Sequence, residues 1–277
     1  MKKPIFLTII FLGLIFQALA QDQAKAYSGE KFSSLDEGID SPVTATIIYD
    51  NYVHTDGLKA DWGYSILIEG AGKTILFDTG TNPKIFRENF EKMKLDASNI
   101  DEVFISHEHG DHFGGLHEFL SLNKEVKVVV PETFSERFIS DYINECKALQ
   151  LVSGPAQISR HLYTTGVMGE QIPEQALVLN TSKGLIVMTG CSHPGIIEML
   201  NEIKETFGKD IYLVFGGFHL MMSSSKNIDK IIAEMKELGV QKCGATHCTG
   251  EKQIGWFREA FGENFVEMGV GNKIIFN

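Results

Sequence analysis

Four metal-ligating side chains lie within six positions near the middle of the chain. The segment 104–116 reads Phe-Ile-Ser-His-Glu-His-Gly-Asp-His-Phe-Gly-Gly-Leu and contains His107, His109, Asp111 and His112. An apolar run, residues 103–105, precedes the histidines and predicts a buried strand, and the Gly-Gly pair after them predicts the start of a helix. Because side chains alternate along extended backbone, His107 and His109 are expected to share one cation. Asp111 and His112 fall at the turn and are expected to face a second cation, at the roughly 3.5–4 Å spacing of two-metal sites.

The ligand types narrow the choice of metal. Imidazole together with carboxylate suits zinc, iron or manganese better than calcium or magnesium, which prefer oxygen ligands. A histidine-rich surface loop without metal is the alternative, but nothing about folding requires three imidazoles and a carboxylate packed this tightly. We therefore expect two divalent metal ions, with zinc as the default and iron or manganese left open.

The segment from His107 to His112 resembles the His-x-His-x-Asp-His motif of the metallo-β-lactamase superfamily, and later stretches resemble its other motifs in order. The resemblance covers residues 43–277 and implies an α+β fold, the four-layer αββα sandwich of two mixed β-sheets flanked by helices. Asp78 resembles the superfamily Asp that braces the metal-binding loop without ligating. His193 resembles the ligand that completes the first metal site, and His247 the last ligand of the second.

The chain departs from the superfamily pattern after the predicted strand 211–215. Many dinuclear members carry a bridging Asp there, whereas this sequence reads Gly-Gly-Phe-His at 216–219. His219 either replaces that ligand or contacts the substrate. Cys191 lies two residues before His193, and Cys248 directly follows His247. We expect these thiols to be buried beside the metal site, Cys191 as a supporting group, with one disulfide among the four cysteines as the alternative.

The N-terminus predicts export. Two lysines precede the apolar run 5–16, and Ala-Leu-Ala at 18–20 resembles a signal peptidase site, so residues 1–20 are expected to be a cleaved signal peptide. An uncleaved anchor is the alternative, but the run is shorter than the roughly 20 residues that a span needs. The mature protein would then be periplasmic or secreted, without a stable membrane anchor. Residues 21–42 are expected to form a polar arm, and residues 43–277 a single domain.

The charge balance disfavours nucleic acid as a partner. The formal net charge is −11 for the whole chain, and it becomes −13 without residues 1–20, which carry two lysines and no acid. Such a surface repels phosphate backbones, and no basic stripe offsets it. The expected partner is a small-molecule substrate, and the sequence leaves the oligomeric state open.

Periodicity predicts the elements that carry the motifs. Strands are expected at 43–49, 64–69, 73–77, 103–105, 126–130, 185–189, 211–215 and 243–246. Helices are expected at 82–93, 116–122, 134–144 and 227–238, the last with Asn227 as its cap. Another helix is expected to begin at Pro194, which places His193 near its N-cap. The motif histidines therefore follow strand ends, where α/β proteins bind ligands.

These features predict a metal-dependent hydrolase. A metal lowers the pKa of bound water towards 7, and Asp111 would act as the catalytic residue that orients the resulting hydroxide while also ligating. Glu108 is expected to point away from the histidines. The substrate pocket is expected to include Trp62, His54 and Phe218.

Two other enzymatic readings and a non-catalytic binding module are kept as alternatives. Several segments, among them Trp62-Gly63, Thr189-Gly-Cys-Ser-His193 and His247-Cys-Thr-Gly250, resemble the superfamily branch of dihydropterin aminobenzene phosphate synthases. A synthase-like transferase activity is therefore one alternative. A mono-iron persulfide dioxygenase is another, because superfamily members with iron carry out such chemistry. The diiron oxygen-reducing type would have Glu where this chain has His109.

Overall fold

The computed structural model describes residues 32 and 35–276. The expected signal peptide, residues 1–20, lies outside the described residues, as does most of the expected arm. Within the part of the chain that is described, no helix is both long enough and apolar enough to cross a bilayer.

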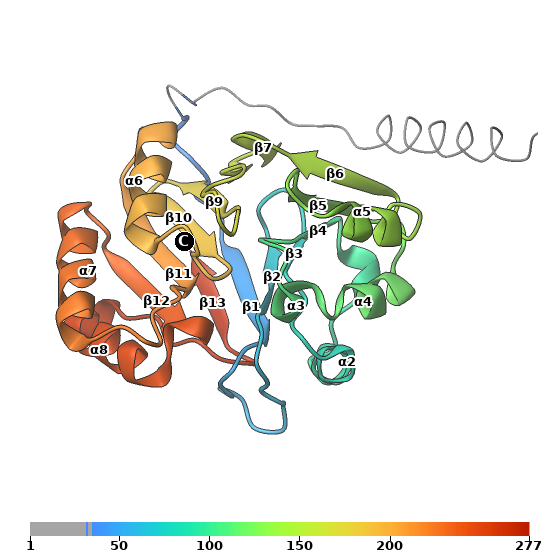
Figure 1. Cartoon of the computed structure of the whole chain (residues 1–277), viewed down its shortest axis with the longest axis horizontal. Helices are drawn as coiled ribbons and strands as arrows, with labels where there is room; N and C mark the ends of the chain where they lie inside the picture. The colour runs from blue at the N-terminus through green and yellow to red at the C-terminus, as the bar shows by residue number, and fades with distance from the viewer. Residues whose placement is uncertain (1–31, 33–34, 277) are drawn as a thin grey trace, which may run out of the picture.

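Two mixed β-sheets form the centre of the molecule (Figure 1). One has seven strands in the order β13-β1-β2-β3-β4-β5-β6, and the other has six in the order β12-β11-β10-β9-β8-β7. The strands are β1 Val43–Tyr49, β2 Ser65–Glu69, β3 Ile75–Phe77, β4 Glu102–Phe104, β5 Lys127–Pro131, β6 Ala148–Val152, β7 Ala156–Ser159, β8 Leu162–Thr164, β9 Leu177–Thr181, β10 Gly184–Thr189, β11 Ile211–Gly217, β12 Lys242–Thr246 and β13 Lys273–Phe276.

Helices cover the outer face of each sheet (Figure 1). On the side of the seven-stranded sheet they are α2 Pro83–Lys92, α3 Gly110–Phe113, α4 Leu116–Leu122 and α5 Glu136–Tyr142; on the side of the six-stranded sheet they are α6 Ile196–Phe207, α7 Ser225–Glu237 and α8 Glu251–Phe261. Three apolar cores lie between the layers. One fills the space between the sheets, and one lies under each set of helices. The expected four-layer αββα sandwich of two mixed sheets is therefore confirmed.

Parallel pairing places the motif strands at one edge. Strands β3 and β4 run parallel in the first sheet, and β10, β11 and β12 run parallel in the second. The carboxyl ends of parallel neighbours meet at the same edge of their sheet. The two edges lie together, since the ring centroids of His107 from the first sheet and His193 from the second are 4.8 Å apart.

The packed body begins before Val43, which differs from the expected boundary of the arm. The Ile39 N–H donates to the Asn180 carbonyl at 2.9 Å, and Ile39 forms an isolated β-bridge with Thr181, the last residue of β9. The Phe32 ring stacks on Phe207 with centroids 5.4 Å apart. Apolar side chains within the otherwise polar segment therefore attach it to the second sheet, which composition alone does not reveal.

Two helix starts differ from the sequence expectation. The cap of α7 is Ser224, whose side chain accepts from the Asn227 N–H, so the helix begins before Asn227. Helix α6 begins at Ile196 rather than Pro194, because Gly195 has φ 101° and cannot continue a helix from Pro194. His193 therefore lies in a loop, not at a helix N-cap.

Candidate metal centre

The described residues contain three groups of side chains able to hold a metal ion. The first is His107, His109 and His193; the second is Asp111, His112, Cys191 and His247; the third is Cys191, His219 and Cys248. Within each group the ligand atoms all lie within 4.8 Å of one another. The first two groups are adjacent, since the ring centroids of His107 and His112 are 4.2 Å apart. All seven residues expected as ligands thus belong to one cluster, and their binding of metal stays a prediction.

Strand ends from both sheets deliver these side chains. The loop after β4 carries His107 and His109, and the short helix α3 that follows carries Asp111; His193 follows β10 of the six-stranded sheet. His247 begins the turn after β12. Its φ is 49°, and that of His219 after β11 is 51°. A non-glycine residue in this left-handed region is uncommon and indicates that surrounding contacts hold it there.

Ser106 and Asp78 fix the orientation of two histidines. The Ser106 hydroxyl donates to Asp78 Oδ2 at 2.8 Å and can therefore only accept from His107 Nδ1, 2.9 Å away. Asp78 Oδ2 also accepts from His112 Nδ1 at 2.6 Å. With hydrogen on both Nδ1 atoms, the Nε2 atoms are the ring nitrogens that face the cluster and can ligate a cation. Asp78 thus contacts both Ser106 and His112, and its role in bracing metal ligands stays a prediction.

Asn51 fixes the orientation of His247 in the same way, although the sequence motifs do not include it. Its Oδ1 accepts from the Gly63 N–H, and its Nδ2 donates to the His247 carbonyl, so the orientation of the amide is fixed. Asn51 Oδ1 therefore accepts from His247 Nδ1 at 2.9 Å. The Nε2 atoms of His247 and His193 are buried and lack a hydrogen-bond partner among the described atoms. Orphaned buried nitrogens of this kind are what a bound cation would satisfy.

The separations match those between ligands of one cation. Two nitrogens at about 2.05 Å from a tetrahedral zinc lie about 3.3 Å apart. His107 Nε2 and His109 Nδ1 are 3.1 Å apart. Asp111 Oδ2 lies 3.4 Å from His247 Nε2 and 3.7 Å from His112 Nε2. The residues therefore fit two cations without rearrangement.

The protonation states of His193 and Asp111 suit cation binding, whereas His112 has to lose a proton first. Burial, with His219 and His109 nearby, lowers the pKa of His193 to about 3, so this imidazole is neutral at pH 7. Burial alone would raise the pKa of Asp111, but the neighbouring imidazoles of His247 and His112 hold it below its usual range. Burial would lower the pKa of His112, yet the Asp78 carboxylate raises it to about 9. A cation at His112 must therefore displace a proton.

Glu174 is a functional residue that the sequence analysis missed. Its fully buried carboxylate accepts from the backbone N–H groups of Gly190, Cys191, Ser192 and His193 at 2.8–3.1 Å. Burial raises the pKa of this carboxyl group, and these hydrogen bonds act in the opposite direction. Glu174 lies in an irregular segment far from any motif, so only the tertiary structure shows that it shapes the loop that presents His193.

The expected pocket residues have three different placements. Trp62 lies at the centre, donating from Nε1 to Asp111 Oδ2 at 2.8 Å with 44% of its surface exposed. Phe218, which follows β11, does not line a pocket: it is 1% exposed and packs in the core against Phe257 of α8. His54 is exposed on the loop before Trp62, where its N–H donates to the Val270 carbonyl. Glu108 points towards α5, accepting from the Ser135 N–H at 2.6 Å.

All four cysteines are free thiols, and Cys191, Cys243 and Cys248 are buried. The structure therefore contains no disulfide among these four cysteines, and the alternative of one bridge is wrong. Cys191 lies closer to the ligands than a supporting role requires, with Sγ 3.2 Å from His112 Nε2.

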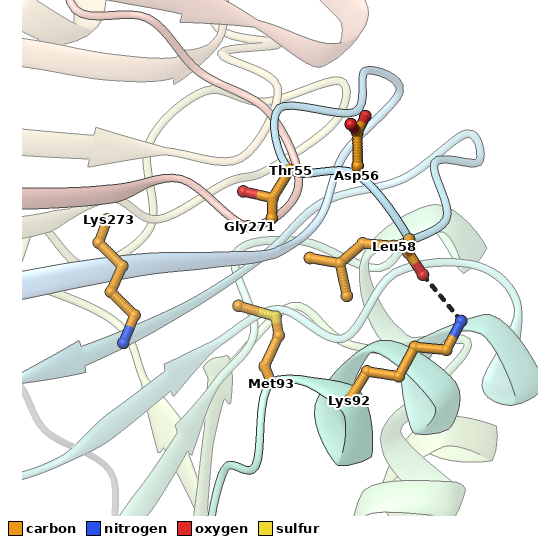
Figure 2. Close-up of a pocket in the computed structure, with 8 residues that line it drawn as sticks. Thr55, Asp56, Leu58, Lys92, Met93, Gly271 and Lys273 are labelled. Carbon is orange, nitrogen blue, oxygen red and sulfur yellow. Dashed lines mark hydrogen bonds between the residues drawn. The ribbon is translucent and has the colours of Figure 1, made fainter.

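A separate cavity of about 340 Å³ lies between the loop at Thr55–Leu58, the end of α2 and the chain before β13. Figure 2 shows Lys92 reaching across it, and its Nζ donates to the Gly57 carbonyl at 2.8 Å. None of the described residues lining this cavity belongs to the three ligand groups.

Comparisons with known proteins agree with this geometry. The profile of the Metallo-beta-lactamase superfamily matches residues 61–187. A relative from Methanocaldococcus jannaschii, 7,8-dihydropterin-6-methyl-4-(β-D-ribofuranosyl)-aminobenzene-5'-phosphate synthase, is 29% identical over 86% of this chain and 98% of its own. The crystal structure of a metal-dependent hydrolase of the β-lactamase superfamily is 28% identical over 84% of this chain and 98% of its own, with a TM-score of 0.71.

A third structure supports the fold alone. The metallo-β-lactamase fold protein YhfI from Bacillus subtilis is 15% identical, covers 85% of this chain and 100% of its own, and has a TM-score of 0.63. The profile match over residues 61–187, the two more similar relatives and the four-layer architecture agree: the chain has the metallo-β-lactamase fold and is similar to members of that superfamily.

Proposed function

We propose that the chain is a metal-dependent hydrolase that acts on a small-molecule substrate with two divalent cations, zinc by default. One observation carries the proposal: the His107–His109–His193 group and the Asp111–His112–His247 group lie side by side, with orphaned ring nitrogens directed into them. When bound, divalent cations lower the pKa of water towards 7 and polarise an attacked carbonyl or phosphoryl group.

Asp111 is the residue that orients the attacking water. One carboxylate oxygen, Oδ2, is held by Trp62 Nε1 and by the proximity of His247 and His112. The lowered pKa keeps the carboxylate ionised, so it accepts a hydrogen bond from water throughout the neutral range. Trp62 thus positions the carboxylate and covers one side of the mouth.

His219 is placed to meet the substrate. Its side chain is exposed, and its ring centroid lies 4.3 Å from the ring centroid of His193. A hydrogen bond with Cys248 raises the pKa of His219 although burial opposes this, which favours the form that can donate a proton to a leaving group. We assign His219 to the substrate side of the centre.

The rim of the mouth favours a substrate with an apolar part. Exposed apolar side chains on segments next to ligand residues are Trp62, Met221 and Met222. Met222 is 95% exposed and lies three residues after His219. Apolar groups left in water at a ligand mouth gain free energy when a substrate covers them.

A synthase-like transfer reaction is the second candidate, because the Methanocaldococcus jannaschii synthase is 29% identical over nearly its whole length. The two candidates differ in what the same centre activates. A hydrolase transfers the substrate's acyl or phosphoryl group to water, whereas a synthase of that kind joins two substrates. Product analysis in ¹⁸O-labelled water separates them, since only hydrolysis places the label in the product.

The test of the proposal combines metal analysis with an ester, lactone, β-lactam and phosphodiester panel. We expect about two equivalents of metal per chain. Asp111→Ala is expected to lower kcat/KM by about 10²–10⁴-fold for whichever class reacts. His117→Ala, an exposed histidine on α4, serves as the matched control and should retain wild-type activity. Full hydrolysis by Asp111→Ala would overturn the proposal.

A further inference from the structure

The second ligand group contains only one carboxylate, and its fourth member is a thiol. Asp111 is the single acidic residue in the cluster of Asp111, His112, Cys191 and His247. The other buried carboxylates around His112 and His247 have other partners, and Asp78 already accepts from Ser106 and from His112 Nδ1. Glu174 accepts from four backbone N–H groups, and Asp50 Oδ2 accepts from the Thr246 hydroxyl at 2.7 Å. Among the described residues, Cys191 is therefore the remaining donor that can complete this group.

The position of Cys191 is that of a ligand. Its Sγ lies 3.2 Å from His112 Nε2 and within 4.8 Å of the ligand atoms of Asp111 and His247. A nitrogen at about 2.05 Å and a sulfur at about 2.3 Å from one tetrahedral zinc are about 3.6 Å apart. His247 Nε2 in the same group is buried and without a partner. The sulfur thus closes a four-donor set around an orphaned nitrogen.

Gly217 leaves room for the sulfur of the neighbouring Cys248. A Cβ on Gly217 would lie 2.6 Å from Cys248 Sγ. Cys248 belongs to the third group with Cys191 and His219, but not to the second. Its Sγ accepts from the His219 N–H at 3.3 Å and lies 3.6 Å from the Cys191 carbonyl. Cys191 therefore belongs to both the second and the third group, whereas Cys248 belongs to the third alone.

We propose that Cys191 is a thiolate ligand of the second cation, completing a set of Asp111, His112, His247 and sulfur. The proposal rests on the metal-binding part of the proposed function and not on hydrolysis. One carboxylate and one thiolate together balance the charge of a divalent cation. Thiolate is a soft ligand that selects zinc over manganese or magnesium, so the sulfur makes this position zinc-selective.

The test uses cobalt as a spectroscopic substitute for zinc in the reduced full chain. Cobalt bound to thiolate gives a near-ultraviolet charge-transfer band, whereas cobalt bound only to nitrogen and oxygen gives visible bands alone. We expect wild-type protein to show the near-ultraviolet band and to bind about two equivalents of cobalt. Cys191→Ser is expected to lose this band while keeping the visible bands of the His107–His109–His193 group.

Two further variants identify the sulfur. Cys146→Ser, a thiol outside the three groups, is the matched control and should keep the full spectrum. Cys248→Ser should also keep the charge-transfer band. Persistence of the band in Cys191→Ser together with its loss in Cys248→Ser would overturn the assignment to Cys191.

A measurement on unaltered protein covers the case in which Cys191→Ser does not fold. X-ray absorption of the zinc-loaded wild type should require a sulfur shell at about 2.3 Å. Two equivalents of zinc without such a shell would overturn this inference and leave the proposed function intact. Failure to bind metal at all would overturn both.

Discussion

His112 and Asp78 form a fully buried pair, with His112 Nδ1 2.6 Å from Asp78 Oδ2. Burial opposes the charge on His112, but Asp78 and then Asp111 raise its pKa from 6.5 to about 9 in the absence of metal. The folded state therefore binds this proton more tightly than the unfolded chain does. This contribution to stability is complete below about pH 6.5 and is lost as the pH rises towards 9.

The metal-free protein should show this loss directly. We expect its free energy of unfolding to fall by on the order of 3 kcal/mol through that pH range, measured by urea titration in a chelating buffer. Asp78→Asn keeps the shape of the side chain but removes its charge, so its profile should be much flatter. Identical slopes in the two proteins would show that the pair does not hold the proton.

Local spacing revealed some site residues but not others. His107, His109, Asp111 and His112 could be found because six consecutive positions contain them. The fit of Cys191 to the second group and the bracing by Asn51 depend on segments separated by many residues. The prediction that Phe218 lines the pocket was wrong, because its position next to His219 in the sequence does not show that its ring packs in the core.

The loop from Gly190 to His193 is held by one carboxylate from another segment. Glu174→Gln replaces one accepting oxygen with an NH₂ group, which would face a backbone N–H donor. We expect a loss of about 1–3 kcal/mol in stability. Because bracing of this kind supports ligand orientation, we also expect a 10–100-fold weaker affinity for one metal equivalent.

Calorimetric titration with zinc measures that change. Glu198→Gln is a suitable control, because Glu198 lies in the first turn of α6 outside the three ligand groups. If the Glu174→Gln variant binds both equivalents of zinc with wild-type affinity, Glu174 does not support the orientation of a metal ligand.

At the level of elements, strongly periodic segments were predicted well. Helix α4 matches its expected bounds, and α2 and α5 lie within theirs. Strands β6, β7, β8 and β9 were not predicted, because between residues 148 and 181 the chain mixes polar and apolar residues without clear alternation. Their pairing with neighbours, and not a local pattern, makes them strands.

At the level of the whole molecule, the candidate metal centre lies between the two sheets. His107 and His109 follow a strand of the seven-stranded sheet, whereas His193 and His247 follow strands of the six-stranded sheet. Cations bound between them should stabilise the fold by mass action, by about 2.7 kcal/mol for a site filled at 100 times its Kd. For a chain of this size, we expect chelation to lower Tm by about 5–10 °C per emptied site.

Differential scanning fluorimetry with and without chelator measures this shift. His247→Ala should lose part of the response, and His117→Ala should keep it. A Tm that does not change while metal analysis shows that the ions have left would contradict the linkage between sheets.

Because the ligands come from both sheets, the metal supply has a consequence for the lifetime of the protein. A chain that matures where zinc is scarce would have a weakened boundary between its halves, with the loops that carry His193 and His247 the first segments open to proteases. The amount of intact protein would then follow the supply of the ion, so that availability of the nutrient metal sets abundance as well as catalytic competence.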